Sequence, residues 1–314
     1  MAVYFSNKMH YNNAICWDNL YKKNATRIVS VSLKPYSVKM HFNMVSNRSA
    51  GNINIFDSSE TTRVASFEFY NWLAGLIDGD GLFIRSKKGY WSCEITLKVP
   101  EYSALTKIKY FFGGTIKKRT NVQAIRWRLT NKKGLVLLAH ALNGRLLSPI
   151  RRNKLLNLLL DFNIPSYTFS NEQIFLNIKQ GWLTGFFEAK GCFLYNSKTK
   201  QLAIRIAQKN KDVLELIIEC FKVGNLFFDK SWNGFILNVS SQEDLNVFLI
   251  IFKNYPFLSG SKQFELKQFN RLLLFKSRKY HLLPLDSRKR KRYENLVKKF
   301  LTRGNLSKEE DIVH

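Results

Sequence analysis

One nine-residue stretch occurs twice in the sequence, as LAGLIDGDG at residues 73–81 and as LTGFFEAKG at residues 183–191, 110 positions further on. The copies differ most at their eighth position, where the first has Asp80 and the second has Lys190. Both copies are apolar or small around most of their circumference and end at glycine, which is typical of a buried helix that stops there. The sequence therefore predicts two equivalent helices with opposite charges at their equivalent ends.

Small residues recur four apart in both copies, at Gly75 and Gly79 in the first and at Gly185 and Ala189 in the second. Residues four apart lie on the same side of a helix, so each predicted helix has a stripe of small residues. Such stripes allow two helix backbones to approach closely. We therefore expect these four residues to form a helix interface that brings the two eighth positions side by side.

The first copy closely resembles the motif of the LAGLIDADG homing endonucleases and their group I intron maturase relatives. The second copy resembles the degenerate second motif of the single-chain, two-repeat members of that family. The resemblance implies an α+β fold with two pseudo-symmetric αββαββα lobes, which pack through the motif helices and form a β-sheet saddle for DNA. Because both repeats lie in one chain, we expect a monomer.

The order of predicted elements repeats along the chain in the same way as the motifs. After each motif the polarity pattern predicts two strands, a helix, two strands and then helices. This duplication supports two similar lobes independently of the motifs themselves. The patterns divide the chain into a loose N-terminal extension (1–65), a first repeat (66–162), a linker (163–171), a second repeat (172–277) and a basic C-terminal tail (278–314).

The composition favours a nucleic-acid partner. The chain of 314 residues carries a formal net charge of +27 and has a pI of about 10.0, and a charge of this size attracts polyanions. An anionic membrane surface is the competing interpretation, but apolar runs such as residues 247–252 are far shorter than the roughly 20 residues that span a bilayer. We therefore expect no membrane partner. The 4 cysteines and 5 histidines are too scattered for a zinc ribbon, a disulfide framework or a histidine-metal nuclease site.

Residues 1–65 are rich in Ser, Asn and Lys and poor in acids, and two interpretations fit them. One is an organelle transit peptide. The other, which we prefer, is the bias of an A+T-rich coding sequence, which also produces abundant Asn, Lys, Phe, Tyr and Ile. The second interpretation predicts an organelle-encoded intron frame, in the mitochondrion or alternatively the chloroplast. The basic run at residues 288–292 is compatible with a nuclear localisation signal or a solvated charge block, but a phosphate-binding arm is the preferred interpretation.

Asp80 is the candidate catalytic and metal-binding acid. An aspartate at a helix C-terminus faces the negative end of the helix dipole, at a cost of about 0.3–1 kcal/mol, and a bound cation compensates for this. The resemblance implies that paired acids from the two motifs bind Mg²⁺ ions, which activate water for phosphodiester hydrolysis. Asp80 matches one of these acids, whereas Lys190 marks the degenerate second position. Glu188 aligns with Asp78 instead, so it is a poor substitute.

The family also implies a basic residue near the end of each repeat that assists at the scissile phosphates. In the second repeat, Lys262 of the segment YPFLSGSKQFELKQF falls at that catalytic position. In the first repeat the similar segment NGRLLSPIRRNKLLNL has Ile150 where lysine is usual. Arg151 and Arg152 are both candidates to replace it.

The alternating strands predict polar faces that are suited to a nucleic-acid groove. In residues 81–87, we expect Leu82 and Ile84 on one face and Phe83 with the polar residues on the other. A half-exposed sheet with a merely solvated face explains any single strand, but not the repetition of polar faces in a chain with this charge. The candidate DNA-binding residues are Arg85, Lys87, Glu94, Thr96, Lys98, Arg126, Arg128, Tyr195, Gln201, Arg205 and Lys209.

These observations favour an intron-encoded homing endonuclease that recognises a long double-stranded DNA site and hydrolyses it with Mg²⁺. Lys190 predicts that cleavage is weak, confined to one strand or lost. The alternative is an RNA maturase that assists splicing of its host group I intron without nuclease chemistry. A third hypothesis is an eroded remnant that binds nucleic acid without specificity.

Overall fold

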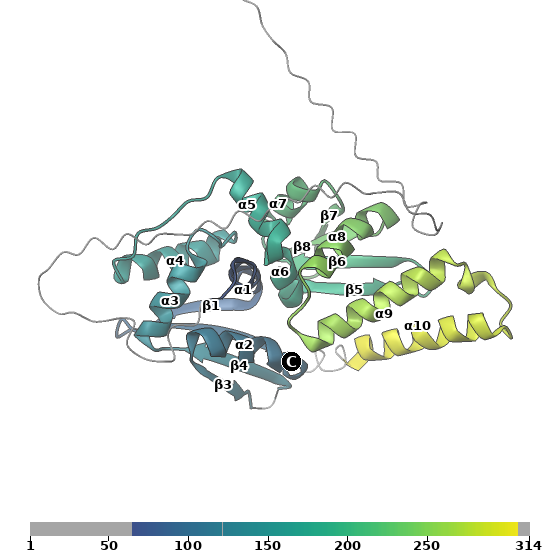
Figure 1. Cartoon of the computed structure of the whole chain (residues 1–314), viewed down its shortest axis with the longest axis horizontal. Helices are drawn as coiled ribbons and strands as arrows, with labels where there is room; N and C mark the ends of the chain where they lie inside the picture. Colours follow the sequence, from purple (N-terminus) through teal and green to yellow (C-terminus); the bar gives the residue numbers. More distant parts are fainter. Residues whose placement is uncertain (1–64, 121, 307–314) are drawn as a thin grey trace, which may run out of the picture. The chain divides into compact units, whose positions relative to one another are not determined.

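The computed structural model describes residues 65–120 and 122–306, which belong to one compact unit of the chain (Figure 1). The expected N-terminal extension lies outside the described residues, apart from its last position. The first repeat contains α1 (Phe67–Asp80), β1 (Gly81–Arg85), β2 (Trp91–Lys98), α2 (Tyr102–Phe112), β3 (Thr115–Lys118), β4 (Ala124–Leu129), α3 (Lys132–Leu142) and α4 (Pro149–Asp161). The second contains α5 (Asn171–Asn177), α6 (Leu183–Lys190), β5 (Gly191–Tyr195), β6 (Leu202–Gln208), α7 (Asp212–Phe221), β7 (Asn225–Asp229), β8 (Gly234–Val239), α8 (Gln242–Asn254) and α9 (Gly260–Ser277), and α10 (Arg288–Leu306) follows it.

Each repeat builds one antiparallel four-stranded sheet, in the orders β1-β2-β4-β3 and β5-β6-β8-β7. Apolar side chains at alternate positions line the face that the helices cover, as Cys93, Ile95 and Leu97 do in β2 and Ile204 and Ile206 do in β6. The opposite face of each sheet is partly exposed. The predicted α+β fold with two pseudo-symmetric lobes is confirmed.

The motif helices begin and end where local chemistry dictates. Ser66 is the N-cap of α1, and its hydroxyl accepts a hydrogen bond from the backbone N–H of Phe69 at 3.3 Å. The helix ends at Gly81, where the backbone becomes extended. The second motif helix follows a kink at Gly181, whose φ of +109° favours glycine. This kink separates α6 from the shorter α5.

The two motif helices, α1 and α6, pack backbone against backbone. A Cβ atom added to Gly75 would lie 2.0 Å from the carbonyl oxygen of Trp182, and one added to Gly185 would lie 1.8 Å from that of Trp72. A Cβ at Gly79 would lie 2.2 Å from the Cβ of Ala189. The four small residues therefore lie in the helix interface, where the sequence predicts them.

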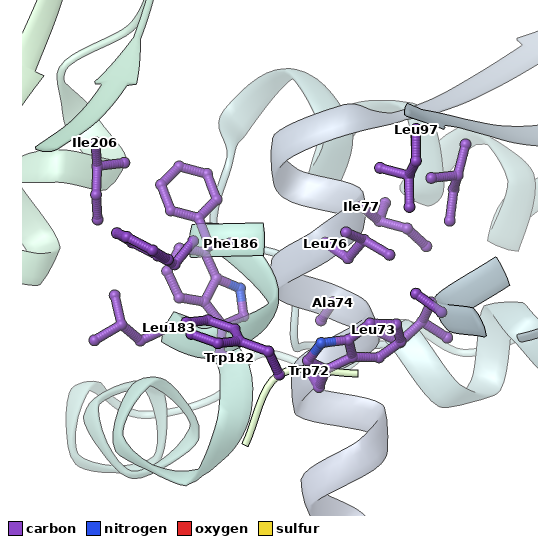
Figure 2. Close-up of a cluster of buried hydrophobic side chains, with 14 of the residues drawn as sticks. Trp72, Leu73, Ala74, Leu76, Ile77, Leu97, Trp182, Leu183, Phe186 and Ile206 are labelled. Carbon is purple, nitrogen blue, oxygen red and sulfur yellow. The ribbon is translucent and has the colours of Figure 1, made fainter. Parts of the chain in front are cut away.

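Two tryptophans at equivalent positions fill the space beside this contact. Trp72 and Trp182 are both buried, and Figure 2 shows them between the two motif helices. Leu97 from the first sheet and Ile206 from the second lie on opposite sides of the pair of helices. Each motif helix is therefore both part of the lobe interface and part of the core of its own lobe.

The predicted basic C-terminal tail contains a helix that the sequence pattern does not mark. Residues 288–306 form α10, which packs on α9 and buries Tyr293, Leu296, Val297 and Phe300. The sequence pattern hides this helix because the run of cations at its start dominates the local composition. None of the helices in the described part of the chain has the length and apolar character needed to cross a membrane.

Replacing Gly75 with alanine should destabilise the fold, because the added methyl group overlaps a backbone carbonyl that has no room to move. We expect the free energy of unfolding to fall by about 1–3 kcal/mol, measured by urea denaturation. Gly260→Ala is the matched control, since a Cβ there meets nothing within 4 Å and alanine favours the helix. Equal stabilities for the two variants would contradict the close helix approach.

Candidate motif-helix site and nucleic-acid interface

The two eighth positions are in direct contact. The Nζ atom of Lys190 lies 2.7 Å from Oδ1 of Asp80, and the two side chains are 31% and 24% exposed. Burial raises the pKa of Asp80, while the ammonium of Lys190 opposes that rise by favouring the carboxylate. The unfavourable position of Asp80 at the end of α1 is therefore compensated by a neighbouring cation from the protein itself.

This arrangement does not fit a pair of divalent cations. Mg²⁺ is held by oxygen ligands, and Lys190 places an ammonium where the family resemblance implies the second carboxylate. Across the described residues, no group of three or more His, Cys, Asp or Glu side chains is arranged to hold a metal ion. Asp80 supplies a single carboxylate, which is already neutralised.

The basic residues at the ends of the two repeats occupy equivalent places. Lys262 donates from Nζ to the carbonyl oxygen of Gly191 at 2.9 Å, and Arg151 donates from Nε to the carbonyl oxygen of Gly81 at 3.1 Å. Of the two arginines that the sequence offers, Arg151 therefore has the geometry of Lys262. The ammonium of Lys262 also lies 3.3 Å from Glu265.

The sixth positions of the motifs, Asp78 and Glu188, have a structural task that the sequence does not reveal. Asp78 accepts hydrogen bonds from the backbone N–H groups of Leu147 and Ser148, at 2.7 and 3.0 Å, just before α4. Glu188 accepts the equivalent bonds from Leu258 and Ser259, at 2.6 and 3.3 Å, just before α9. Each acid therefore fixes the start of the helix that carries the basic residue of its own lobe.

The same two acids also connect the lobes. The indole N–H of Trp182 donates to Asp78 at 3.0 Å, and that of Trp72 donates to Glu188 at 3.1 Å. Each motif thus provides one donor and one acceptor to the other motif. Burial raises the pKa of Asp78 to about 7 and that of Glu188 to about 8, although the N–H donors favour the ionised forms.

The outer face of the first sheet, here called the first-lobe strand face, is polar at its centre. Glu94, Thr96, Lys98, Arg126 and Arg128 share this face by the pairing of β2 with β4. The side chain of Glu94 is 7% exposed because two arginines cover it. Arg126 Nη1 lies 3.2 Å from Oε2 of Glu94, and Arg128 Nε lies 2.6 Å from Oε1. The remaining residues of this face are Leu82, Ile84, Ser92, Thr115, Lys117 and Ala124.

The predicted faces of the first strand are wrong. Leu82 pairs with Glu94 and is 51% exposed, whereas Phe83 is 6% exposed and belongs to the core. Arg85 consequently lies on the helix-covered side, 3.0 Å from Asp161 of α4. Lys87 lies in the turn after β1. Neither Arg85 nor Lys87 is part of the first-lobe strand face.

The outer face of the second sheet, the second-lobe strand face, contains fewer of the predicted residues. Arg205 lies at its centre and donates from Nε to Oδ1 of Asn238 at 2.9 Å. Gln201 and Lys209 are exposed and flank β6 at its two ends. Tyr195 was predicted on this face, but it lies on the core side, where its hydroxyl group is 2.7 Å from that of Tyr293. The sequence does not show that α10 covers this end of β5.

The face is completed by small and apolar residues that the sequence analysis does not single out. They are Cys192, Leu194, Ala203, Ala207, Phe227, Gly234 and Ile236, together with Asn225 and Asp229.

Two pseudo-symmetric lobes joined by paired motif helices define the single-chain, two-repeat class of LAGLIDADG proteins. The model of the LAGLIDADG endonuclease family matches residues 73–159 and 183–273, one segment in each lobe. The chain therefore belongs to the LAGLIDADG endonuclease family.

Relatives with curated names include both maturases and endonucleases. The chain is 34% identical to the intron-encoded RNA maturase bI4 of Saccharomyces cerevisiae, over 79% of this chain and 40% of the relative. It is 35% identical to a probable intron-encoded endonuclease, aI2, of Debaryomyces hansenii, over 66% of this chain and 32% of the relative. The matched region thus spans less than half the length of either relative.

Solved structures with the same fold include endonucleases bound to DNA. The meganuclease I-SmaMI bound to uncleaveable DNA superposes with a TM-score of 0.56 at 18% identity, over 76% of this chain and 97% of that one. The homing endonuclease I-LtrWI bound to its target DNA gives a TM-score of 0.52 at 20% identity, over 74% and 97% of the two chains. At these identities the likeness concerns the fold.

The buried acids predict how stability depends on pH. An acid whose pKa is raised on folding stabilises the fold below its unfolded pKa, and this contribution is lost as the pH rises through the folded pKa. The pKa of Asp78 rises from 3.8 to about 7 on folding. That of Glu188 rises from 4.5 to about 8. We therefore expect the free energy of unfolding to decrease from pH 5 to pH 8.

In the double variant Asp78→Asn, Glu188→Gln, the free energy of unfolding should decrease less between pH 5 and pH 8 than in the wild type. Urea denaturation at each pH measures this difference. Glu243→Gln changes an exposed acid and should keep the wild-type profile. If the double variant and the wild type lose stability equally with rising pH, Asp78 and Glu188 are not the source of the pH dependence.

Proposed function

We propose that this protein binds a long site in double-stranded DNA through the first-lobe and second-lobe strand faces. The observation that carries the proposal is the presence, at the centre of each face, of arginines held by a neighbouring polar side chain. Arginines fixed in this way suit phosphates and base edges in a groove. The net charge of +27 adds a long-range attraction for DNA.

We further propose that the motif-helix site does not break both DNA strands. Cleavage with Mg²⁺ needs acidic oxygens at both eighth positions in the scheme that the family resemblance implies, and Lys190 supplies an ammonium instead. Its ion pair with Asp80 occupies the remaining carboxylate. A nick in one strand is the most that we expect from this site.

Maturation of the host group I intron is the second candidate function, and the same ion pair favours it. An RNA maturase needs a stable nucleic-acid-binding scaffold but no hydrolytic centre, and the Asp80–Lys190 pair keeps the scaffold while removing the centre. The similarity to a maturase supports this candidate.

We propose that the protein acts as a monomer encoded in a mitochondrial intron, because both lobes lie in one chain and the relatives are named as intron-encoded.

Restoring the second acid should restore cleavage. Wild-type protein, incubated with Mg²⁺ and a supercoiled plasmid that carries the intronless insertion site, should give open circles at most. Lys190→Glu should give linear product, because two carboxylates then face each other at the base of the motif helices. Lys253→Glu, which makes the same charge change at an exposed position of α8, is the control and should behave as the wild type.

The melting temperature gives a second test of the same site. Mg²⁺ should raise the melting temperature of Lys190→Glu, because the ion relieves repulsion between the paired acids, and it should leave that of the wild type unchanged. Linear product from the wild-type protein would overturn the proposal that Lys190 blocks double-strand cleavage.

The maturase candidate predicts faster splicing of the host intron at moderate salt when the protein is added. Lys190→Glu should accelerate splicing as well as the wild type does, because maturation does not use the cleavage site. An unrelated group I intron serves as the control RNA. Affinity for the intron RNA should fall steeply as salt rises, because phosphate contacts release bound counterions. Failure to accelerate the host intron would exclude this function.

A further inference from the structure

The two strand faces carry different chemistry at equivalent positions. In the first lobe the central cross-strand row is Leu82–Glu94–Arg128, and in the second lobe the corresponding row is Cys192–Arg205–Asn238. Arg205 thus stands where the first lobe has Glu94. The same position of the sheet therefore carries an acid in one lobe and a base in the other.

In the first lobe, Glu94 acts as a fixed support beneath two guanidinium groups. Its carboxylate uses one oxygen for each arginine, at 3.2 Å to Arg126 and 2.6 Å to Arg128. The arginine side chains are 38% and 47% exposed, so their remaining N–H groups are accessible. A guanidinium with a fixed plane is suited to the two acceptors O6 and N7 of guanine in the major groove.

In the second lobe only one guanidinium is fixed in this way. Arg205 is held by Asn238, and the strands of this face carry no further cation, although the exposed Lys209 directly follows β6. Most of the other side chains of this face are apolar, and Phe227 is 53% exposed. Lys98 and Lys117, by contrast, add two further cations to the first-lobe strand face.

An apolar surface that faces DNA has one natural contact in the major groove, the C5 methyl group of thymine. Apolar side chains flank Arg205 on both sides, as the pair Leu194–Ala203 and as the row Ala207–Ile236–Phe227, and they are available for such contacts. The arginine supplies the attraction for DNA that a purely apolar surface lacks. This combination favours A·T pairs around a single guanine.

We propose that the two lobes recognise halves of the DNA site with different base composition. The first-lobe strand face selects two guanines through Arg126 and Arg128, with Glu94 as their positioning residue. The second-lobe strand face selects thymines through their methyl groups, around one guanine at Arg205. This inference rests on the proposed function, that the strand faces bind duplex DNA.

Selection of binding sites from a random duplex library provides the first test. The enriched site should have one half with two preferred guanines and another half rich in A·T pairs. Thymines of the enriched site are then replaced by deoxyuridine, which removes only the C5 methyl group. Each replacement in the A·T-rich half should weaken binding about fourfold. In the other half, a replacement should matter only where the thymine meets Leu82 or Ile84, the two exposed apolar side chains of the first-lobe strand face.

The variant Glu94→Gln shows which half of the DNA site the first lobe binds. It also tests whether Glu94 orients Arg126 and Arg128. Removal of one negative charge raises affinity for any DNA if charge alone matters. If Glu94 orients the arginines, the preference for guanine at two positions should fall by about fivefold or more at each, while affinity for random DNA rises. Glu243→Gln, with the same charge change on α8, should raise both affinities alike.

The outcomes separate this inference from the proposed function. If no sequence is enriched, both fail. If a site is enriched but deoxyuridine weakens binding equally in both halves or in neither, the inference fails alone, and the apolar surface is then available to a protein partner. If Glu94→Gln behaves as Glu243→Gln does, Glu94 is not a positioning residue and the assignment of the first lobe is overturned.

Discussion

The backbone-to-backbone contact between α1 and α6 is the constraint on which the rest of the structure depends. Glycine at positions 75 and 185 allows each helix to meet the carbonyl oxygen of a tryptophan in the other. This approach brings each tryptophan N–H to the sixth-position acid of the opposite motif, and those acids fix the starts of α4 and α9. The positions of Arg151 and Lys262, and the meeting of Asp80 with Lys190, all follow from one close contact.

Much of this architecture is predictable from the sequence because duplication makes weak signals reinforce each other. The order of helices and strands within each repeat and the small residues of the helix interface follow from patterns that occur twice. The face of β1 is not predictable in that way, because Leu82, Phe83 and Ile84 are all apolar and alternation cannot choose between them. Only the pairing of Leu82 with Glu94 decides it. The predicted face of Tyr195 is also wrong, because the burial of this residue depends on α10, which lies nearly 100 residues later in the chain.

Some features of the candidate site can be predicted from the sequence, and others depend on the three-dimensional structure. The chemical conflict between Asp80 and Lys190 is visible in the aligned motifs, and the structure adds that the two side chains pair. The role of Asp78 and Glu188 is not visible, because their partners are backbone N–H groups, which carry no sequence signal. The choice of Arg151 over Arg152 likewise depends on a bond to a backbone carbonyl.

The sixth and eighth positions of the motif are therefore under different physical constraints. Loss of a sixth-position acid would leave several buried N–H groups without an acceptor, at a cost of about 1–3 kcal/mol for each unsatisfied group. Exchange of an eighth-position acid for lysine has no such cost, since the new ammonium is partly exposed and pairs with the remaining carboxylate. Hydrolytic chemistry can then be lost while the fold and both strand faces persist. The proposed nucleic-acid binding depends on the fold and the strand faces and not on the Asp80–Lys190 pair, so the two properties can change independently.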